Sequence, residues 1–162
     1  MITQQRLFEL FDYKDGNLYW KVNRQYIKAG SIAGTNRDDG YIVICVDQKR
    51  YRAHRLIFMF HNGYYPNEID HIDGNPANNK IENLRESNRK LNMMNVGRYS
   101  TNTSGYKNIS WNANCCKWQV RLRVNNMNKS FGYYEDLELA ELVAYEARNK
   151  YHGRYANHGE LL

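Results

Sequence analysis

The chain has 162 residues, of which 42% are hydrophobic and 14% aromatic, enough for one ordinary domain or two small ones with packed cores. Its formal net charge of +6 and pI near 9.2 favour a polyanionic partner. No run of about 18 apolar residues and no basic start followed by an apolar core is present, so we expect neither a membrane span nor a secretory signal, but an intracellular protein.

The first third of the chain is predicted to form one helix, a hairpin and further strands. Residues 3–11 have apolar side chains at helical spacing. A turn at residues 14–17 predicts a hairpin, and strands are expected to dominate residues 18–53. The sequence HRLIFMFH at residues 54–61 predicts a packing helix that ends before Gly63.

A segment at residues 69–95 follows the order strand, turn, strand and helix. Asp70 and His71 end a short apolar run, and a turn rich in Asp, Gly, Asn and Pro comes next. A short strand is expected at Leu84, followed by a polar helix with Ser87 as its N-cap. This segment holds the residues with the chemistry for phosphodiester hydrolysis.

Three side chains of this segment could divide that chemistry between them. Asp70 and Asn92 offer hard oxygen ligands for a divalent cation. His71 is a base whose unperturbed pKa of about 6.5 leaves it largely neutral at pH 7. Neighbouring residues on a regular strand point to opposite faces, so Asp70 and His71 can serve one site only if the strand bends or ends there.

The three cysteines form no C-x-x-C pair, so we expect no zinc site and predict reduced, structural thiols. A calcium loop is not expected either, because Asp70, Asp73 and Gly74 lack the D-x-D-x-D-G spacing and the Glu at the twelfth position.

The remainder of the chain predicts a second, basic module behind a linker at residues 98–105. Residues 117–124, KWQVRLRV, alternate cleanly between an apolar and a polar face. With strands at 106–111 and 129–134 they predict a three-stranded antiparallel sheet. A helix that Asp136 caps would cover its apolar face. From residue 98 to 134 there is no Asp or Glu.

Several short motifs in the first part occur together in one order: AHRL at 53–56, DHIDGN at 70–75, NLR at 83–85 and N-x-x-N at 92–95. In these motifs the chain resembles HNH endonucleases, and more narrowly the homing endonucleases of phages and group I introns. In that family a ββα-metal finger cuts DNA and separate modules hold it. The resemblance covers roughly residues 50–97.

The resemblance implies a role for each matching residue. His71 would be the general base, and Asp70 and Asn92 would bind one divalent ion, Mg²⁺ or Mn²⁺. Asn83 would brace the loop, with His54 and Asn95 in supporting positions. The last His of the family name is replaced by Asn92, and an amide oxygen does not favour a transition metal.

Residues 106–155 resemble the Apetala-two (ethylene-response-factor) type of DNA-binding domain, through YKNISW, KWQVRLRV, FGYYED and the Ala-rich helix. That resemblance implies a sheet lying in the major groove. Arg121 and Arg123 would be the best base readers, because Arg can bond guanine bidentately, and Trp111 a possible apolar contact. The other expected DNA contacts, mainly to phosphate, are Arg98, Lys107, Lys117 and Lys129.

Together these patterns predict an α+β chain. Residues 1–97 would form a β-rich HNH nuclease domain, residues 106–155 the DNA-binding domain and residues 156–162 a tail. The expected function is metal-dependent, site-directed cleavage of double-stranded DNA by a monomer, in the bacterial cytoplasm if the gene belongs to a phage. The alternatives are a non-catalytic, sequence-specific DNA-binding regulator and an RNA-binding protein, although the RNP pattern of an RRM is absent.

Overall fold

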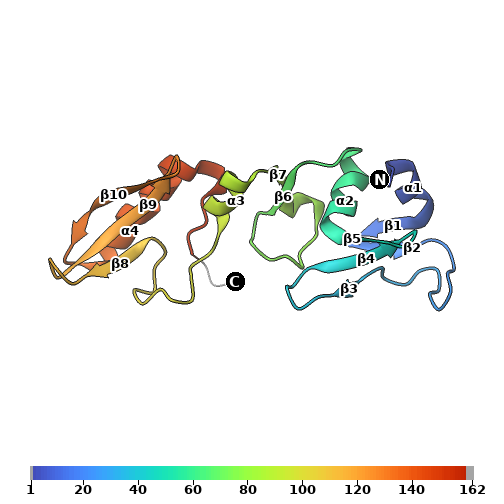
Figure 1. Ribbon diagram of the computed structural model, residues 1–162, viewed down its shortest axis with the longest axis horizontal. Coiled ribbons are helices and arrows are strands. Elements are labelled where there is room, and N and C mark those ends of the chain that lie inside the picture. Colours follow the sequence, from blue (N-terminus) through green and yellow to red (C-terminus); the bar gives the residue numbers. More distant parts are fainter. Residues whose placement is uncertain (1, 160–162) are drawn as a thin grey trace. The chain divides into compact units, whose positions relative to one another are not determined.

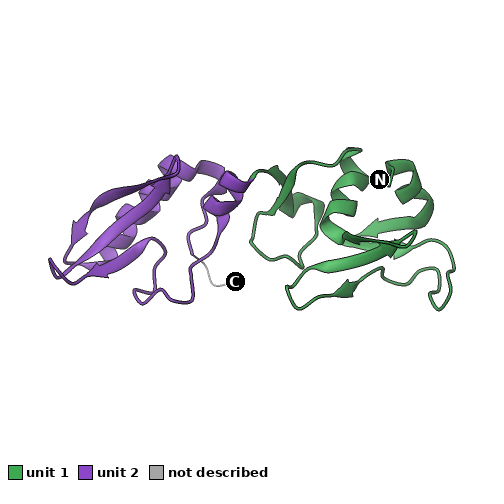
Figure 2. Ribbon diagram, in the orientation of Figure 1, with its two compact units in different colours: residues 1–88 green, residues 89–162 purple. Residues whose placement is uncertain are grey.

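A computed structural model describes residues 2–159. The chain divides into two compact units, with the boundary in the sequence between Asn88 and Arg89 (Figure 2). Each unit has a hydrophobic core of its own. Over the described residues the fold is a mixture of four α-helices and small antiparallel sheets. In this part of the chain no helix is both long and apolar enough to span a membrane. Residues 160–162 of the predicted tail lie outside the described residues.

The first unit begins with a short helix and a tight hairpin (Figure 1). Helix α1 is Gln4–Leu10, and Thr3 caps it by accepting a hydrogen bond from the Arg6 amide. Strands β1 (Phe11–Lys14) and β2 (Asn17–Trp20) pair antiparallel around the predicted turn. Both the helix and the hairpin are therefore confirmed.

The next three strands form a small sheet in sequence order: β3 (Thr35–Asn36), β4 (Ile42–Val46) and β5 (Lys49–Arg52). Strands occupy less of residues 18–53 than predicted, because residues 21–34 make only isolated bridges. Helix α2 (Ala53–Asn62) follows β5 directly and ends at Gly63, whose φ of 78° is the left-handed conformation that glycine tolerates. Its Leu56 and Ile57 are fully buried in the core of the unit.

Residues 68–87 form a further hairpin. Strands β6 (Glu68–His71) and β7 (Leu84–Ser87) pair antiparallel, with Asp70 opposite Arg85, and a 3₁₀ turn η1 (Ile81–Asn83) precedes β7. β6 ends at His71, as required for Asp70 and His71 to serve one site. The prediction that Ser87 caps the following helix is wrong, because Ser87 is the last residue of β7.

The second unit starts with helix α3 (Arg89–Asn95), which the sequence analysis had placed in the first domain. A three-stranded antiparallel sheet follows, with β9 (Lys117–Val124) between β8 (Ile109–Asn112) and β10 (Met127–Tyr134). β8 begins later than predicted, since residues 104–108 form a turn in which Asn108 has a φ of 69°.

Helix α4 (Leu137–His152) packs on one face of this sheet (Figure 1). Asp136 caps it by accepting a hydrogen bond of 2.7 Å from the Leu139 amide, and Gly153 opens the short 3₁₀ turn η2 (Gly153–Tyr155). Small residues let helix and sheet approach closely, and the buried contacts are Val120, Leu122, Ala140, Ala144 and Ala147. The predicted alternation of β9 is confirmed: Arg121 and Arg123 are exposed on the opposite face.

Candidate active site

His71 is buried at the end of β6 and faces a side chain from the following loop. Its Nε2 lies 3.0 Å from Oδ1 of Asn79, which is also buried. With the amide oxygen as acceptor, Nε2 carries the hydrogen and Nδ1 becomes the basic nitrogen of the ring. Asn79 therefore selects one tautomer of the neutral His71 ring.

Two aromatic rings pack against His71. The His54 ring lies edge-on to it with centroids 5.1 Å apart, and the Tyr41 ring centroid is 6.1 Å away. Burial, and after it the proximity of His71, Arg52 and Arg55, lowers the pKa of His54 to about 3. His54 is thus neutral at pH 7 and supports His71 by packing, without adding a positive charge beside it.

Asp70 is held by an ion pair with Arg85, its partner across the β6–β7 ladder. Arg85 Nη2 and Nε lie 2.5 Å and 2.8 Å from Asp70 Oδ2, and both side chains are largely buried. The arginine compensates the cost of burying the carboxylate and orients it. A cation that binds Asp70 must share the carboxylate with Arg85 or displace it.

Asn83 ties the loop between the two strands together. Its amide nitrogen donates to Asp73 Oδ1 at 2.9 Å and to the Asn78 carbonyl at 2.8 Å, while its Oδ1 accepts from the Asp73 amide at 3.0 Å. Burial alone would raise the pKa of Asp73, but hydrogen bonds from Asn78 and Asn83 bring it below its usual value. The loop that presents Asn79 is therefore fixed at several points.

The remaining candidate ligands lie on α3, which belongs to the second unit: Asn92 is half-buried and Asn95 is buried. Among residues 2–159, no group of three or more His, Cys, Asp or Glu side chains is arranged to hold a metal ion. One carboxylate and one amide oxygen do suit Mg²⁺, which keeps several waters and takes phosphate oxygens as further ligands. Joint binding by Asp70 and Asn92 stays a prediction.

The predicted DNA contacts belong to the second unit and have different surroundings. Trp111 is half-exposed and packs edge-on against Trp118. Lys117 pairs with Glu135 at 3.1 Å, and Lys129 donates to the Tyr151 hydroxyl at 2.9 Å.

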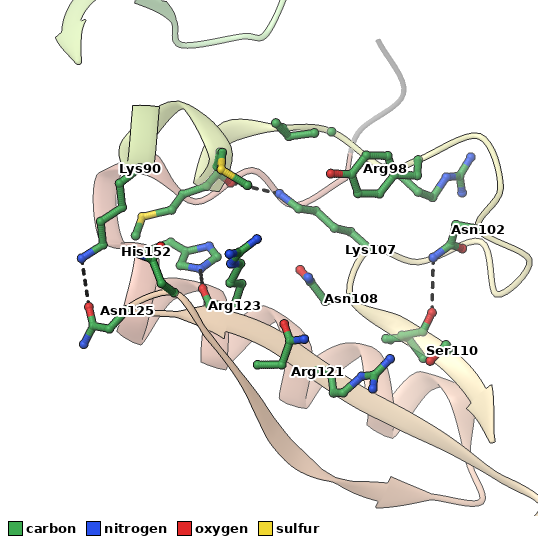
Figure 3. Close-up of a pocket in the computed structure, with 18 residues that line it drawn as sticks. Lys90, Arg98, Asn102, Lys107, Asn108, Ser110, Arg121, Arg123, Asn125 and His152 are labelled. Atoms are coloured by element: carbon green, nitrogen blue, oxygen red, sulfur yellow. Dashed lines mark hydrogen bonds between the residues drawn. The ribbon is translucent and has the colours of Figure 1, made fainter. Parts of the chain in front are cut away.

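Four others line one cavity: Arg98, Lys107, Arg121 and Arg123 (Figure 3). Arg98 donates to the Gly105 carbonyl. Lys107 is buried, and its ammonium donates to the Met94 and Asn157 carbonyls at 3.1 Å and 2.9 Å.

Three residues that contact the site were not predicted from the sequence: Asn79, Arg85 and Tyr41. Asn79 directly follows Asn78 in the loop, and its sequence surroundings are the same as those of ordinary turn residues. Arg85 could have been found, because pairing of the two strands places it opposite Asp70. Tyr41 precedes β4 and packs against the His54 and His71 rings, a tertiary contact that no local pattern encodes.

Comparison with known proteins finds a family for part of the chain. Residues 51–94, which include α2, the β6–β7 hairpin and most of α3, match the HNH endonuclease family. The chain is 36% identical over 94 residues to "Protein 3.8" of Escherichia phage T7. The aligned region covers 58% of this chain and 74% of that protein. No solved structure matches significantly.

Proposed function

Because the chain belongs to the family of phage T7 protein 3.8 and carries an HNH endonuclease domain at residues 51–94, we propose that it is a metal-dependent, site-directed DNA endonuclease of the homing type. The observation that supports the catalytic step most strongly is the buried His71, whose Nε2 faces the Asn79 amide oxygen. A histidine held this way is prepared to accept a proton at Nδ1.

In the proposed reaction, Nδ1 of His71 takes a proton from a water molecule, and the water oxygen attacks the phosphorus of the scissile bond. Asn79 holds the ring while it becomes positive, because its amide oxygen accepts from Nε2 throughout. The neutral His54 does not oppose that charge. The tied loop between β6 and β7 keeps Asn79 in place.

We propose that Asp70 and Asn92 hold one Mg²⁺ or Mn²⁺ ion. When bound, such an ion stabilises negative charge on the phosphate and on the leaving oxygen. The ion pair with Arg85 orients the Asp70 carboxylate before the ion binds. Asn95 would support this arrangement as a reserve oxygen donor.

The second unit is proposed to hold the DNA. Three antiparallel strands backed by one helix are the topology of the Apetala-two type domain, and this supports the resemblance in sequence. Arg121 and Arg123 are exposed on the sheet face opposite α4, the face that would lie toward the DNA. Arg98, Lys117 and Lys129 would neutralise phosphates.

A non-catalytic DNA-binding regulator is the second candidate, since the basic sheet alone would explain binding. The two functions differ in what the first unit requires: a regulator needs DNA affinity but no general base. Cleavage that depends on His71 and on a divalent ion would exclude the regulator.

The metal requirement can be tested on supercoiled plasmid DNA. We expect nicked or linear DNA with Mg²⁺ or Mn²⁺ and intact plasmid in excess EDTA, because the proposed ligands are oxygens. Asp70→Asn should also weaken Mn²⁺ binding in calorimetry without DNA, with Glu135→Gln in the second unit as the control. Undiminished cutting in EDTA would contradict a metal-dependent mechanism.

A further inference from the structure

The second unit contains a cavity of about 370 Å³ on the side of the sheet that carries Arg121 and Arg123 (Figure 3). Met93 and Met94 of α3, residues 96–99, and residues 107–110 at the start of β8 contribute to its other walls. Its volume lies at the small end of the range of about 300–1,000 Å³ typical of small-ligand sites. The cavity is therefore large enough for one small molecule or one unit of a polymer.

The lining carries positive charge and no negative charge. Five of the lining side chains are cationic and none is Asp or Glu: Lys90, Arg98, Lys107, Arg121 and Arg123. Within residues 2–159 none of the five takes part in an ion pair. Neutral groups hold three of them: Lys90 donates to the Asn125 amide oxygen at 2.9 Å, and Lys107 and Arg98 donate to backbone carbonyls. This positive charge favours binding of an anionic ligand such as a phosphate.

Two buried polar atoms in the lining have no hydrogen-bond partner within the described residues: Oδ1 of Asn108 and Nδ1 of His152. His152 Nε2 lies 3.2 Å from the Arg123 carbonyl oxygen and donates to it, which leaves Nδ1 as an acceptor. Burial lowers the pKa of His152, so the ring is neutral at pH 7. Both atoms therefore accept hydrogen bonds, and the phosphate group of a phosphomonoester dianion has no donor to offer them.

A ligand that is complementary to this lining has a phosphate for the cationic side chains and N–H donors for the acceptors of Asn108 and His152. Nucleobases carry such donors on amino and imino groups, and Met93, Met94 and Tyr99 in the lining offer apolar surface to a flat ring. We propose that this cavity binds a single phosphorylated nucleoside, with the phosphate at Arg121 and Arg123 and the N–H edge of the base at Asn108 and His152.

The nucleotide could be one displaced from a DNA strand or a free mononucleotide. Displacement of one nucleotide is an established way for proteins to read or act on a base. The first source rests on the proposed function, because it requires that the chain binds DNA. The second source does not, and the two can be measured separately.

Calorimetry on the full chain tests the site without any cleavage. We expect dAMP to bind at least about tenfold more tightly than inorganic phosphate or deoxyadenosine, because only dAMP has both a phosphate for the arginines and base N–H donors for Asn108 and His152. Arg121→Gln and Asn108→Gly should each weaken dAMP binding by about tenfold or more. Glycine tolerates the positive φ of Asn108, and Arg121 is exposed, so both variants should fold. Lys150→Gln, on an exposed part of α4 outside the cavity, is the matched control.

The source of the nucleotide can be identified with duplex DNA that contains one 2-aminopurine. The His71→Ala chain is used, because it should bind this DNA without cutting it. A rise in fluorescence that Arg121→Gln abolishes supports a nucleotide displaced from DNA; dAMP binding without such a rise supports a free nucleotide. If dAMP binds no better than phosphate, or if neither cavity variant weakens it, the proposal is overturned. A chain that fails to cut DNA but binds dAMP as described would refute only the nuclease.

Discussion

At the scale of single residues, the account depends on how Asn79 holds His71. The contact of 3.0 Å joins two buried side chains, so neither water nor another residue easily replaces it. A carboxylate at the same position would keep the geometry and change the charge. The pair therefore offers a way to separate orientation of the base from its proton affinity.

We predict that Asn79→Ala lowers kcat by roughly tenfold or more, though by less than the factor of about 10²–10⁴ that a general base contributes. Asn79→Asp should instead move the acid limb of the pH–rate profile to higher pH, since a carboxylate stabilises the imidazolium and raises the pKa of His71. Stopped assays from pH 5 to 9 measure both effects. An unchanged limb in Asn79→Asp would show that this contact does not act on the base.

The sequence pointed to Asp70, His71 and Asn83 as candidate site residues, but not to all of the side chains that contact them. Asp70, His71 and Asn83 stand out because short motifs carry them, and β6 does end at His71 as the hypothesis required. Asn79 and Tyr41 could not be predicted, because their roles come from a loop and a packing arrangement that no local pattern encodes. The Arg85 ion pair follows only once the register of β6 and β7 is known.

At the scale of elements, α2 buries His54 against the end of β6. The Tyr41 ring packs against this ring, and the other titratable groups near it, His71, Arg52 and Arg55, are all basic. Burial is the main cause of the low pKa of His54. The unfolded chain binds a proton at His54 below a pH of about 6.5, while the folded chain does so only near pH 3. The stability that this neutral histidine gives is complete above pH 6.5 and is lost as the pH falls toward 3.

We therefore predict that the first unit loses about 2 kcal/mol of unfolding free energy between pH 7 and pH 5 through this residue. Urea unfolding at the two pH values measures the loss. In His54→Gln the difference between the two pH values should shrink by about that amount. If wild type and variant showed the same pH dependence, His54 would not be the group responsible.

Periodic elements were predicted well and irregular ones poorly. The alternation of β9 and the Ala-rich stripe of α4 follow from side-chain periodicity, which one packed face imposes over many residues. The cap of α3 was misplaced because Ser87 completes a β ladder opposite Glu68 and so cannot also open a helix. Tertiary pairing there outweighs the local preference of serine for N-caps.

In the whole molecule, we propose that the first unit cleaves DNA and the second unit binds it. Each unit has its own buried core, so each should fold without the other. We predict that residues 89–162 alone bind duplex DNA, while residues 1–88 alone cut poorly, because the first unit lacks both the second unit's DNA contacts and Asn92.

If the second unit neutralises about four phosphates, log K should fall against log salt with a slope near −3.6, a loss on the order of a hundredfold from 50 to 200 mM. Titrations of labelled duplex measure this slope. A salt-independent affinity, or tight binding by residues 1–88 alone, would contradict the division of roles.

The most direct test of the central claim compares His71→Ala with the wild-type chain on one duplex target, with cleavage rate and DNA affinity measured side by side in Mg²⁺. The account predicts a rate lower by about 10²–10⁴ and nearly the same affinity, because a general base acts in the transition state. Cleavage at the wild-type rate, or a loss of affinity as large as the loss of rate, would contradict it.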